Sequence, residues 1–226
     1  MILFLFGGNM RTLRVTGKGN LKIHPDLTRI TITVTGKNKD YAETLKNSSE
    51  TTEKLKTLFA QFGFKHSDLK TLRFDVDVEY EDYRENNEYK RRFAGYRYNH
   101  TTKIEFDSDN GLLGKLLYAL ANSNLNPEFN ISYTVKDQEA SKNELLSKAV
   151  KDAKEKAEVL AKASGVALKE IQSVDYSKGE ISMDFSPMRL EAPRMAKMNT
   201  AGSFDIDVEP DDISVSDTVT LIWEIE

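Results

Sequence analysis

Acidic residues alternate along the stretch "LRFDVDVEYE", a spacing that could serve acid–base or metal chemistry. They are Asp75, Asp77, Glu79 and Glu81. Alternate residues on a strand share a face and lie roughly 7 Å apart, which is too far for neighbouring carboxylates to share one metal ion. A pair of catalytic acids is conceivable at that separation. The stretch that follows offers cations on the matching parity, namely Arg91, Arg97 and Lys103. Cross-strand ion pairs therefore explain the acidic row, and we expect its role to be structural.

Other residue types offer little support for catalysis. The histidines, His24, His66 and His100, lack the spacing of metal ligands, and each is expected at the surface or at a rim. Gly17 and Gly19 lack the third glycine and the strand-to-helix setting of a dinucleotide loop, and no Walker or G-x-S-x-G motif occurs. Without cysteine there is no thiolate nucleophile and no cysteine metal cluster. We expect no enzymatic activity, no cofactor and no metal site.

Methionines gather in an irregular stretch at about 179–209. It contains Met183, Met188, Met195 and Met198, together with two prolines. Thioethers suit Cu(I), but methionine also adapts to irregular protein surfaces. Because long irregular stretches are usually functional or disordered, we expect a flexible arm that packs on a partner subunit, with plain disorder as the alternative.

The elements that would position these residues follow a βαββαβ order. "LTRITITVTGK" alternates apolar and polar residues as a half-buried strand does, and Asp40 then occupies the N-cap position of a helix that ends near Gly63. "LRFDVDVEY" and "GYRYNHTTKIEF" predict a long hairpin; its first strand places Leu72, Phe74, Val76, Val78 and Tyr80 inward. A helix from about residue 110 and the strand "FNISYTVKD" follow. This order predicts a ferredoxin-like core, an antiparallel sheet with helices on one face.

Further elements extend this core at both ends. The strand "RTLRVTGKG" precedes it, and Asp137 begins a long helix that Gly165 ends. "LKEIQSVDYS" and "DISVSDTVTLIWEIE" read as two more strands. The fold class is therefore α+β. We expect an N-terminal extension at 1–10 and one domain at 11–226, with its core at about 27–137, a helix-strand-strand extension at about 138–226 and the flexible loop at 179–209.

Composition and the first residues bear on partners and compartment. The chain has 226 residues and a net charge of -4, which argues against general nucleic-acid binding because that needs a basic face. The opening apolar run, Ile2 to Phe6, is too short for a membrane span, and no cation or cleavage site marks it as a signal peptide. We expect a cytoplasmic protein whose residues 1–9 are a start-site extension or, alternatively, an arm that docks on a neighbour.

Four stretches together resemble one known family. They are "VTGKGNLKIHPDLTRITITVTGK", "FAGYRYNHTTKIEF", "SKAVKDAKEKAEVLAKASGVALKEIQSV" and "ISVSDTVTLIWEI". The chain resembles the SIMPL-domain family, which includes bacterial periplasmic immunogenic and oxidative-stress-defence proteins and an animal signalling adaptor. The resemblance implies an α+β domain that assembles, in some bacterial members, into large ring-like or channel-like homo-oligomers. It implies no agreed enzymatic activity, and by itself it implies a periplasmic or exported location.

The expected function is self-assembly into a homo-oligomer larger than a dimer, with a stress- or envelope-related role implied by the resemblance. The alternative is an adaptor that binds another protein as a monomer or dimer. The hairpin is longer than usual, and an exposed strand edge invites pairing with another chain. The expected contact residues are Tyr83, Tyr89, Arg91 and Phe93 in the hairpin and Met188, Met195 and Met198 in the arm.

Overall fold

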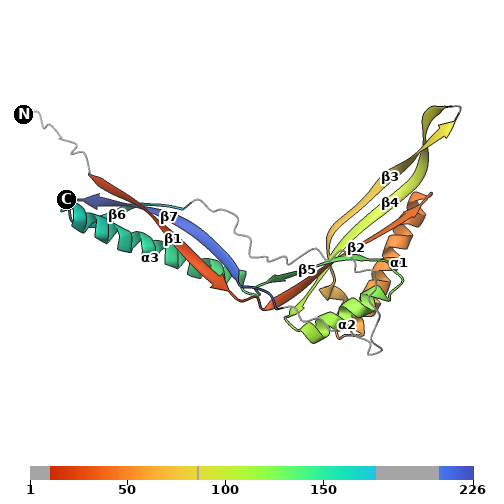
Figure 1. Cartoon of the computed structure of the whole chain (residues 1–226), viewed down its shortest axis with the longest axis horizontal. Coiled ribbons are helices and arrows are strands. Elements are labelled where there is room, and N and C mark those ends of the chain that lie inside the picture. The colour runs from red at the N-terminus through yellow and green to blue at the C-terminus, as the bar shows by residue number, and fades with distance from the viewer. Residues whose placement is uncertain (1–10, 86, 177–208) are drawn as a thin grey trace, which may run out of the picture. The chain divides into compact units, whose positions relative to one another are not determined.

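The structure, a computed structural model, describes residues 11–85, 87–176 and 209–226. It is a mixed α+β fold with three α-helices and two antiparallel sheets, which confirms the predicted class at that level. The chain forms two compact units. We call residues 25–134 the hairpin unit. The α3 unit comprises the described residues up to 24, from 135 to 176 and from 211 to 226 (Figure 1).

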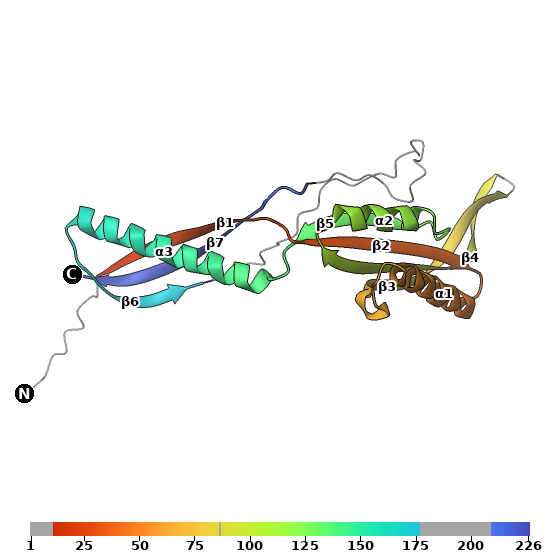
Figure 2. The ribbon, with the colours of Figure 1, turned by 90° about the horizontal axis from the view of Figure 1, so that it is seen from below.

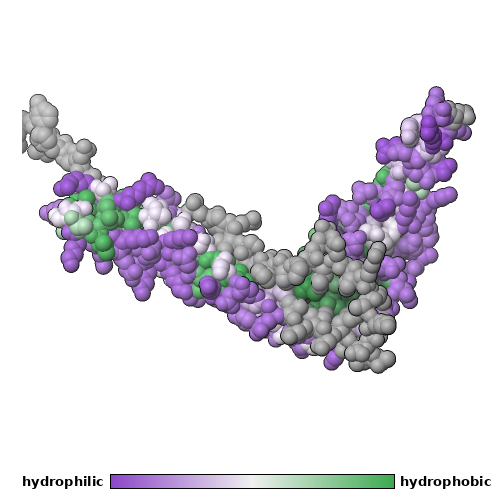
Figure 3. Space-filling view, viewed as in Figure 1, coloured by the Kyte–Doolittle hydropathy of each residue, from purple (hydrophilic) through white to green (hydrophobic). Residues whose placement is uncertain are grey.

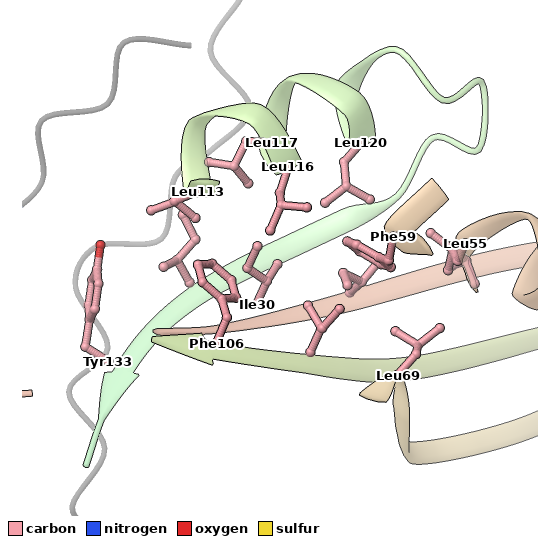
Figure 4. Close-up of a cluster of buried hydrophobic side chains, with 14 of the residues drawn as sticks. Ile30, Leu55, Phe59, Leu69, Phe106, Leu113, Leu116, Leu117, Leu120 and Tyr133 are labelled. Carbon is pink, nitrogen blue, oxygen red and sulfur yellow. The ribbon is translucent and has the colours of Figure 1, made fainter. Parts of the chain in front are cut away.

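The hairpin unit has a four-stranded antiparallel sheet in the order β3-β4-β2-β5. Its helices and strands are β2 (Leu27–Asn38), α1 (Tyr41–Ala60), the short 3-10 helix η1 (His66–Asp68), β3 (Lys70–Glu85), β4 (Glu88–Asp107), α2 (Asn110–Ala121) and β5 (Glu128–Thr134). One face of β2 presents Ile30, Ile32 and Val34, all fully buried. Residues from both helices join the same apolar cluster, and Figure 4 shows the α2 leucines pointing onto the sheet.

The α3 unit has a three-stranded sheet in the order β1-β7-β6, with α3 packed against it. Its elements are β1 (Thr12–Ile23), α3 (Gln138–Ser164), β6 (Leu168–Asp175) and β7 (Ile213–Ile225). The helix buries a row of small residues spaced four apart, including Ala149 and Ala153. At Gly17 an added Cβ would lie 2.1 Å from the Ala149 carbonyl oxygen, so the backbones of helix and strand are nearly in contact (Figure 2).

Residues close in the sequence cap the ends of the helices. Asp40 accepts a hydrogen bond from the Glu43 amide (3.0 Å), and Asp137 accepts one from the Ala140 amide (2.8 Å). These bonds satisfy donors that the first helical turn leaves free, as the sequence predicted. Gly165 follows α3 with a φ of 68°, the left-handed conformation that glycine adopts most easily. The first helix ends at Ala60, slightly before the predicted Gly63.

One prediction about the hairpin is wrong. Of the side chains expected inward on β3, four are exposed large hydrophobics, namely Leu72, Phe74, Val78 and Tyr80. The alternation is present, but β3 is the outermost strand of its sheet, and only Val76 among these residues packs against the core.

Some predictions fall on residues that the structure does not describe. Residues 1–10 and 177–208 lie outside the described residues, and so do Met188, Met195 and Met198. Within the described ranges, no helix is both long and apolar enough to cross a membrane.

Candidate interaction surface

The far half of the β3–β4 hairpin is a two-stranded ribbon. Strand β2 ends at Asn38, opposite Tyr96, so β4 pairs with β2 only up to that point. Beyond it, residues 88–95 of β4 pair with β3 alone, among the described strands. Figure 1 shows this ribbon extending past the end of β2. The ribbon also extends past the described helices, so none of them covers its far part in Figure 1.

A β-bulge at the base of the ribbon determines which side chains share a face. Glu79 is opposite Gly95, but Tyr80 is opposite Phe93, so β4 has one extra residue there. Gly95 has a φ of 138°, and an added Cβ would lie 2.4 Å from the Asn38 carbonyl oxygen. Glycine meets both demands, the unusual φ and the close approach. The bulge brings Phe93 and Tyr96, three residues apart, onto the same face.

That face carries a continuous row of aromatic rings. Tyr41, at the start of α1, contacts Tyr96 with ring centroids 5.3 Å apart. Phe93 contacts Tyr96 (5.3 Å) and Tyr80 (6.4 Å), and the Arg91 guanidinium lies 4.6 Å from the Tyr80 ring centroid. We call Tyr41, Tyr80, Phe93, Tyr96 and Arg91 the aromatic row. Tyr41, Tyr80 and Phe93 are each about half exposed, so the row holds its geometry through internal ring contacts while remaining open to solvent.

The opposite face of the ribbon is charged. Glu79 accepts a hydrogen bond from Lys37 Nζ (2.7 Å) and pairs with Arg97, and Glu81 pairs with Arg92. The hydrogen bond from Lys37, opposed by partial burial and aided by Arg97, lowers the pKa of Glu79. A carboxylate held ionised in this way is a poor general acid. Hydrophilic residues dominate the hairpin surface in the view of Figure 3.

The prediction that three cations of β4 pair with the acidic row is confirmed for Arg97. It is wrong for Arg91, whose cross-strand partner lies outside that row, and for Lys103. Arg91 lies 3.9 Å from Asp82 on the aromatic face, because the bulge reverses the alternation of β4. Lys103 pairs with Glu105 on its own strand. Arg92, which was not among the predicted partners, pairs with Glu81.

The predicted contact residues of the hairpin divide between its two faces. Phe93 and Arg91 belong to the aromatic row. Tyr89, near the tip, is 82% exposed, and the Arg84 guanidinium lies 5.7 Å from its ring centroid. Tyr83 lies on the charged face, 5.1 Å from the Arg92 guanidinium. Sequence reasoning missed Tyr41, Tyr80 and Tyr96 as surface residues. The feature of the sequence that could have identified them is the cluster of aromatic residues around a hairpin that is too long for the neighbouring helices to cover.

His100 was expected at a rim and is instead buried, with 7% exposure. Thr52 Oγ1 lies 3.0 Å from its Nδ1, and Thr71 Oγ1 lies 2.9 Å from its Nε2. Thr52 already donates its proton to the Ser48 carbonyl (2.9 Å), so it accepts from Nδ1–H, and Thr71 donates to Nε2. Burial, reinforced by the nearby Lys56, lowers the pKa of His100. This neutral imidazole links α1, β3 and β4 and is a structural residue.

Of the other two histidines, His24 has a carboxylate neighbour. His24 is exposed, with Nδ1 3.4 Å from an Asp212 carboxylate oxygen. Among the described residues there is no group of three or more His, Asp or Glu side chains placed to hold a metal ion.

Comparison with known proteins identifies the family but no function. A search of curated proteins gives no match to the chain. The sequence model of the SIMPL family, described as a protein of unknown function (DUF541), matches residues 13–223, nearly the whole chain. The match spans both units and includes the ribbon with its aromatic row. This protein therefore belongs to the SIMPL (DUF541) family.

Proposed function

We propose that this protein is a non-enzymatic subunit of a homo-oligomer larger than a dimer, and that the β3–β4 ribbon makes a principal contact. The observation that carries the proposal is the aromatic row on a ribbon that no described helix covers. Rings that pack on one another and stay half exposed form a ready-made contact surface, because little conformational entropy remains to be lost on binding.

The composition of the row supports a protein partner. Tyrosine, phenylalanine and arginine are enriched at interface cores, where a buried aromatic surface and a planar cation supply most of the binding energy. An exposed apolar patch rimmed by polar groups is typical of an interaction site. The ion pairs on the opposite face keep that side of the ribbon hydrophilic.

Closed rotational symmetry is the usual outcome when identical chains repeat one contact. A ring-like or channel-like assembly is therefore the form we propose. The resemblance to SIMPL relatives that assemble in this way supports it.

We also propose that the hairpin unit is a ferredoxin-like core. Two features support this assignment: the antiparallel order β3-β4-β2-β5 and the contribution of both α1 and α2 to one apolar cluster.

The test is the molar mass by light scattering at micromolar concentration, for the wild type and for Tyr80→Ser combined with Phe93→Ser. We expect the wild type to have several times the mass of one chain. Removing two adjacent rings from the row should shift the protein toward smaller species. The matched control is Ile171→Ser with Val174→Ser, which removes two exposed apolar side chains from β6.

A monomeric wild type would refute self-assembly and favour the adaptor alternative, in which the same row binds a different protein. A wild-type oligomer that is equally sensitive to the β6 control would refute the role of the ribbon. The cytoplasmic location remains a prediction, and fractionation of cells that express the native gene tests it.

A further inference from the structure

The outer edge of β1 pairs with no other strand among the described residues. The Ile225 amide donates to the Arg11 carbonyl (3.0 Å), so the odd-numbered residues of β1 form the hydrogen-bonded pairs with β7. The amides and carbonyls of Thr12, Arg14 and Thr16 therefore point outward, and no described strand pairs with them. The Lys18 amide also points outward but donates to Asp152 of α3 (2.7 Å). Asp152 thus ends the open stretch of this edge.

A groove runs beside the same stretch of β1. It has a volume of about 460 Å³ and is lined by Val15, Asp152, Glu155, Lys156, Val159 and Leu160. Val159 is 68% exposed and Leu160 is 45% exposed, although both belong to the helix that covers this sheet. Hydrophobic residues reach the surface of the α3 unit near the start of β1 in Figure 3. A strand added to β1 would cover these side chains.

The outer edge of β3 is the complementary structure in the hairpin unit. This strand is the outermost of its sheet, and no described strand pairs with its outer edge. On its helix-facing side Phe74 and Val78 are 44% and 47% exposed. On its other side Asp75, Asp77 and Glu79 form an acidic row, in which Asp75 pairs with Arg73 of the same strand and Glu79 with Lys37 and Arg97. The open face of β1 presents the exposed cations Arg14 and Lys18, of which Arg14 lies 3.4 Å from an Asp175 carboxylate oxygen of β6.

We propose that the outer edge of β3 in one copy pairs with the outer edge of β1 in a second copy, over Thr12–Thr16. This inference rests on the proposed self-assembly and names the surface that the hairpin binds. The apolar side of β3 then covers Val159 and Leu160, and its acidic row faces Arg14 and Lys18.

The orientation of the two faces is consistent with one continuous sheet. In the α3 unit the helix covers the face that bears Val15, and in the hairpin unit the helices cover the face that bears Val76. Joining the two edges places every helix on the same side. The acidic and basic rows then lie together on the other side, where opposite charges across neighbouring strands stabilise the pair.

Pairing of β3 with β1 joins different surfaces of the two copies. It is therefore a heterologous contact, which closes into a ring or propagates as a filament.

The experiment reverses the charges on each edge. The first variant combines Arg14→Glu with Lys18→Glu, the second combines Asp75→Lys with Asp77→Lys, and the third carries all four changes. Light scattering over a dilution series gives the concentration at which each assembly dissociates. We expect each single-edge variant to dissociate at a concentration at least about tenfold higher than the wild type, because like charges then face each other. The variant that carries all four changes should dissociate at a concentration close to that of the wild type.

Two further measurements guard against misfolding. Circular dichroism and thermal unfolding should show that each variant is folded.

An equimolar mixture of the two single-edge variants should reassemble, because reversed β1 edges then meet reversed β3 edges. Val159→Asp should weaken assembly, and Val174→Asp on β6 should not.

The outcomes separate the two proposals. A monomeric wild type refutes self-assembly and this inference together. A wild-type oligomer that tolerates both reversals, or single-edge defects that neither combination nor mixing repairs, refutes the pairing of β3 with β1 and leaves self-assembly standing. Weakening by each reversal with recovery in the combined variant supports it.

Discussion

In the hairpin unit and in the α3 unit alike, one face of an antiparallel sheet is covered by helix. The two units differ in what fills the space between helix and sheet. The hairpin unit packs large side chains there, such as Phe59, Ile32 and Leu116, all essentially buried. The α3 unit brings helix and strand backbones together over glycine and alanine, with Gly17 against Ala149 and Ala153. A core of large side chains can relax around a lost methyl group, whereas a backbone contact has no room for an added one.

The units also differ at their free edges. The hairpin unit continues its apolar face past its helices and exposes a row of aromatic rings. In the α3 unit, Asp152 accepts a hydrogen bond from the Lys18 amide near the middle of the outer edge of β1. The first half of that edge, which lies beside the groove, pairs with no described strand. The difference indicates that tight backbone packing maintains the shape of the α3 unit, whereas the hairpin unit extends its sheet past its helices and leaves aromatic rings exposed.

The largest effect should come from Gly17→Ala. The new Cβ would lie 2.1 Å from the Ala149 carbonyl oxygen and 2.4 Å from the Ala153 amide nitrogen, both backbone atoms, so α3 must move away from β1. We expect a loss of more than about 3 kcal/mol in the free energy of unfolding, at the upper end for overpacking. Urea unfolding measures it, with Gly111→Ala as control: its nearest contact is the Asp109 side chain at 3.2 Å, and alanine favours a helix. Equal stability of the two variants would contradict the close packing of α3 on β1.

Acid should destabilise the hairpin unit through His100. Its pKa is lowered in the folded state by burial, so below its ordinary value of 6.5 the unfolded chain binds more protons. Stability should therefore be complete above that pH and should fall as the pH drops from 6.5 toward 5, by at most about 1.4 kcal/mol per pH unit for one proton. Urea unfolding at several pH values, for the wild type and for His100→Gln, checks this. An unchanged pH dependence in the variant would assign the effect to other groups.

Ile32→Val should cost about 1 kcal/mol, as expected for the loss of one buried methylene group. Gly17→Ala changes the chain by one carbon as well, so this pair of variants compares the two kinds of core directly. The same urea titration measures both. A cost for Ile32→Val as large as that for Gly17→Ala would mean that the two cores are equally rigid.

The smallest effect should come from Asp75→Asn with Asp77→Asn, measured on the monomer in dilute solution. Exposed charge pairs contribute little, so we expect a change within about 1 kcal/mol in the free energy of unfolding. Divalent metal ions should leave the melting temperature of both forms unchanged. A metal-dependent rise in the wild type alone would show that the acidic row binds an ion.

Local sequence rules determined the positions of most elements. Asp40 and Asp137 begin helices and Gly165 ends one, because capping depends on atoms within a single turn. The alternation in residues 27–37 predicted a strand with one buried face, and β2 has one. The length of the hairpin could also be read from the sequence, and it is the basis for predicting Tyr89, Arg91 and Phe93 as contact residues.

Only the tertiary structure decided which faces are covered and which side chains share them. Alternation predicts that Phe74 and Val78 share a face, but it cannot say that β3 is an edge strand beyond the reach of the core. The bulge at Gly95 reverses the alternation of β4, moving Arg91 and Phe93 to the side of Tyr96. His100 is buried because α1 and β3 meet over it, and an added Cβ at Gly17 would meet the backbone of α3 because that helix packs on β1. The reason is the same in each case: capping and alternation depend on nearby residues, whereas register and burial depend on chain segments far apart in the sequence.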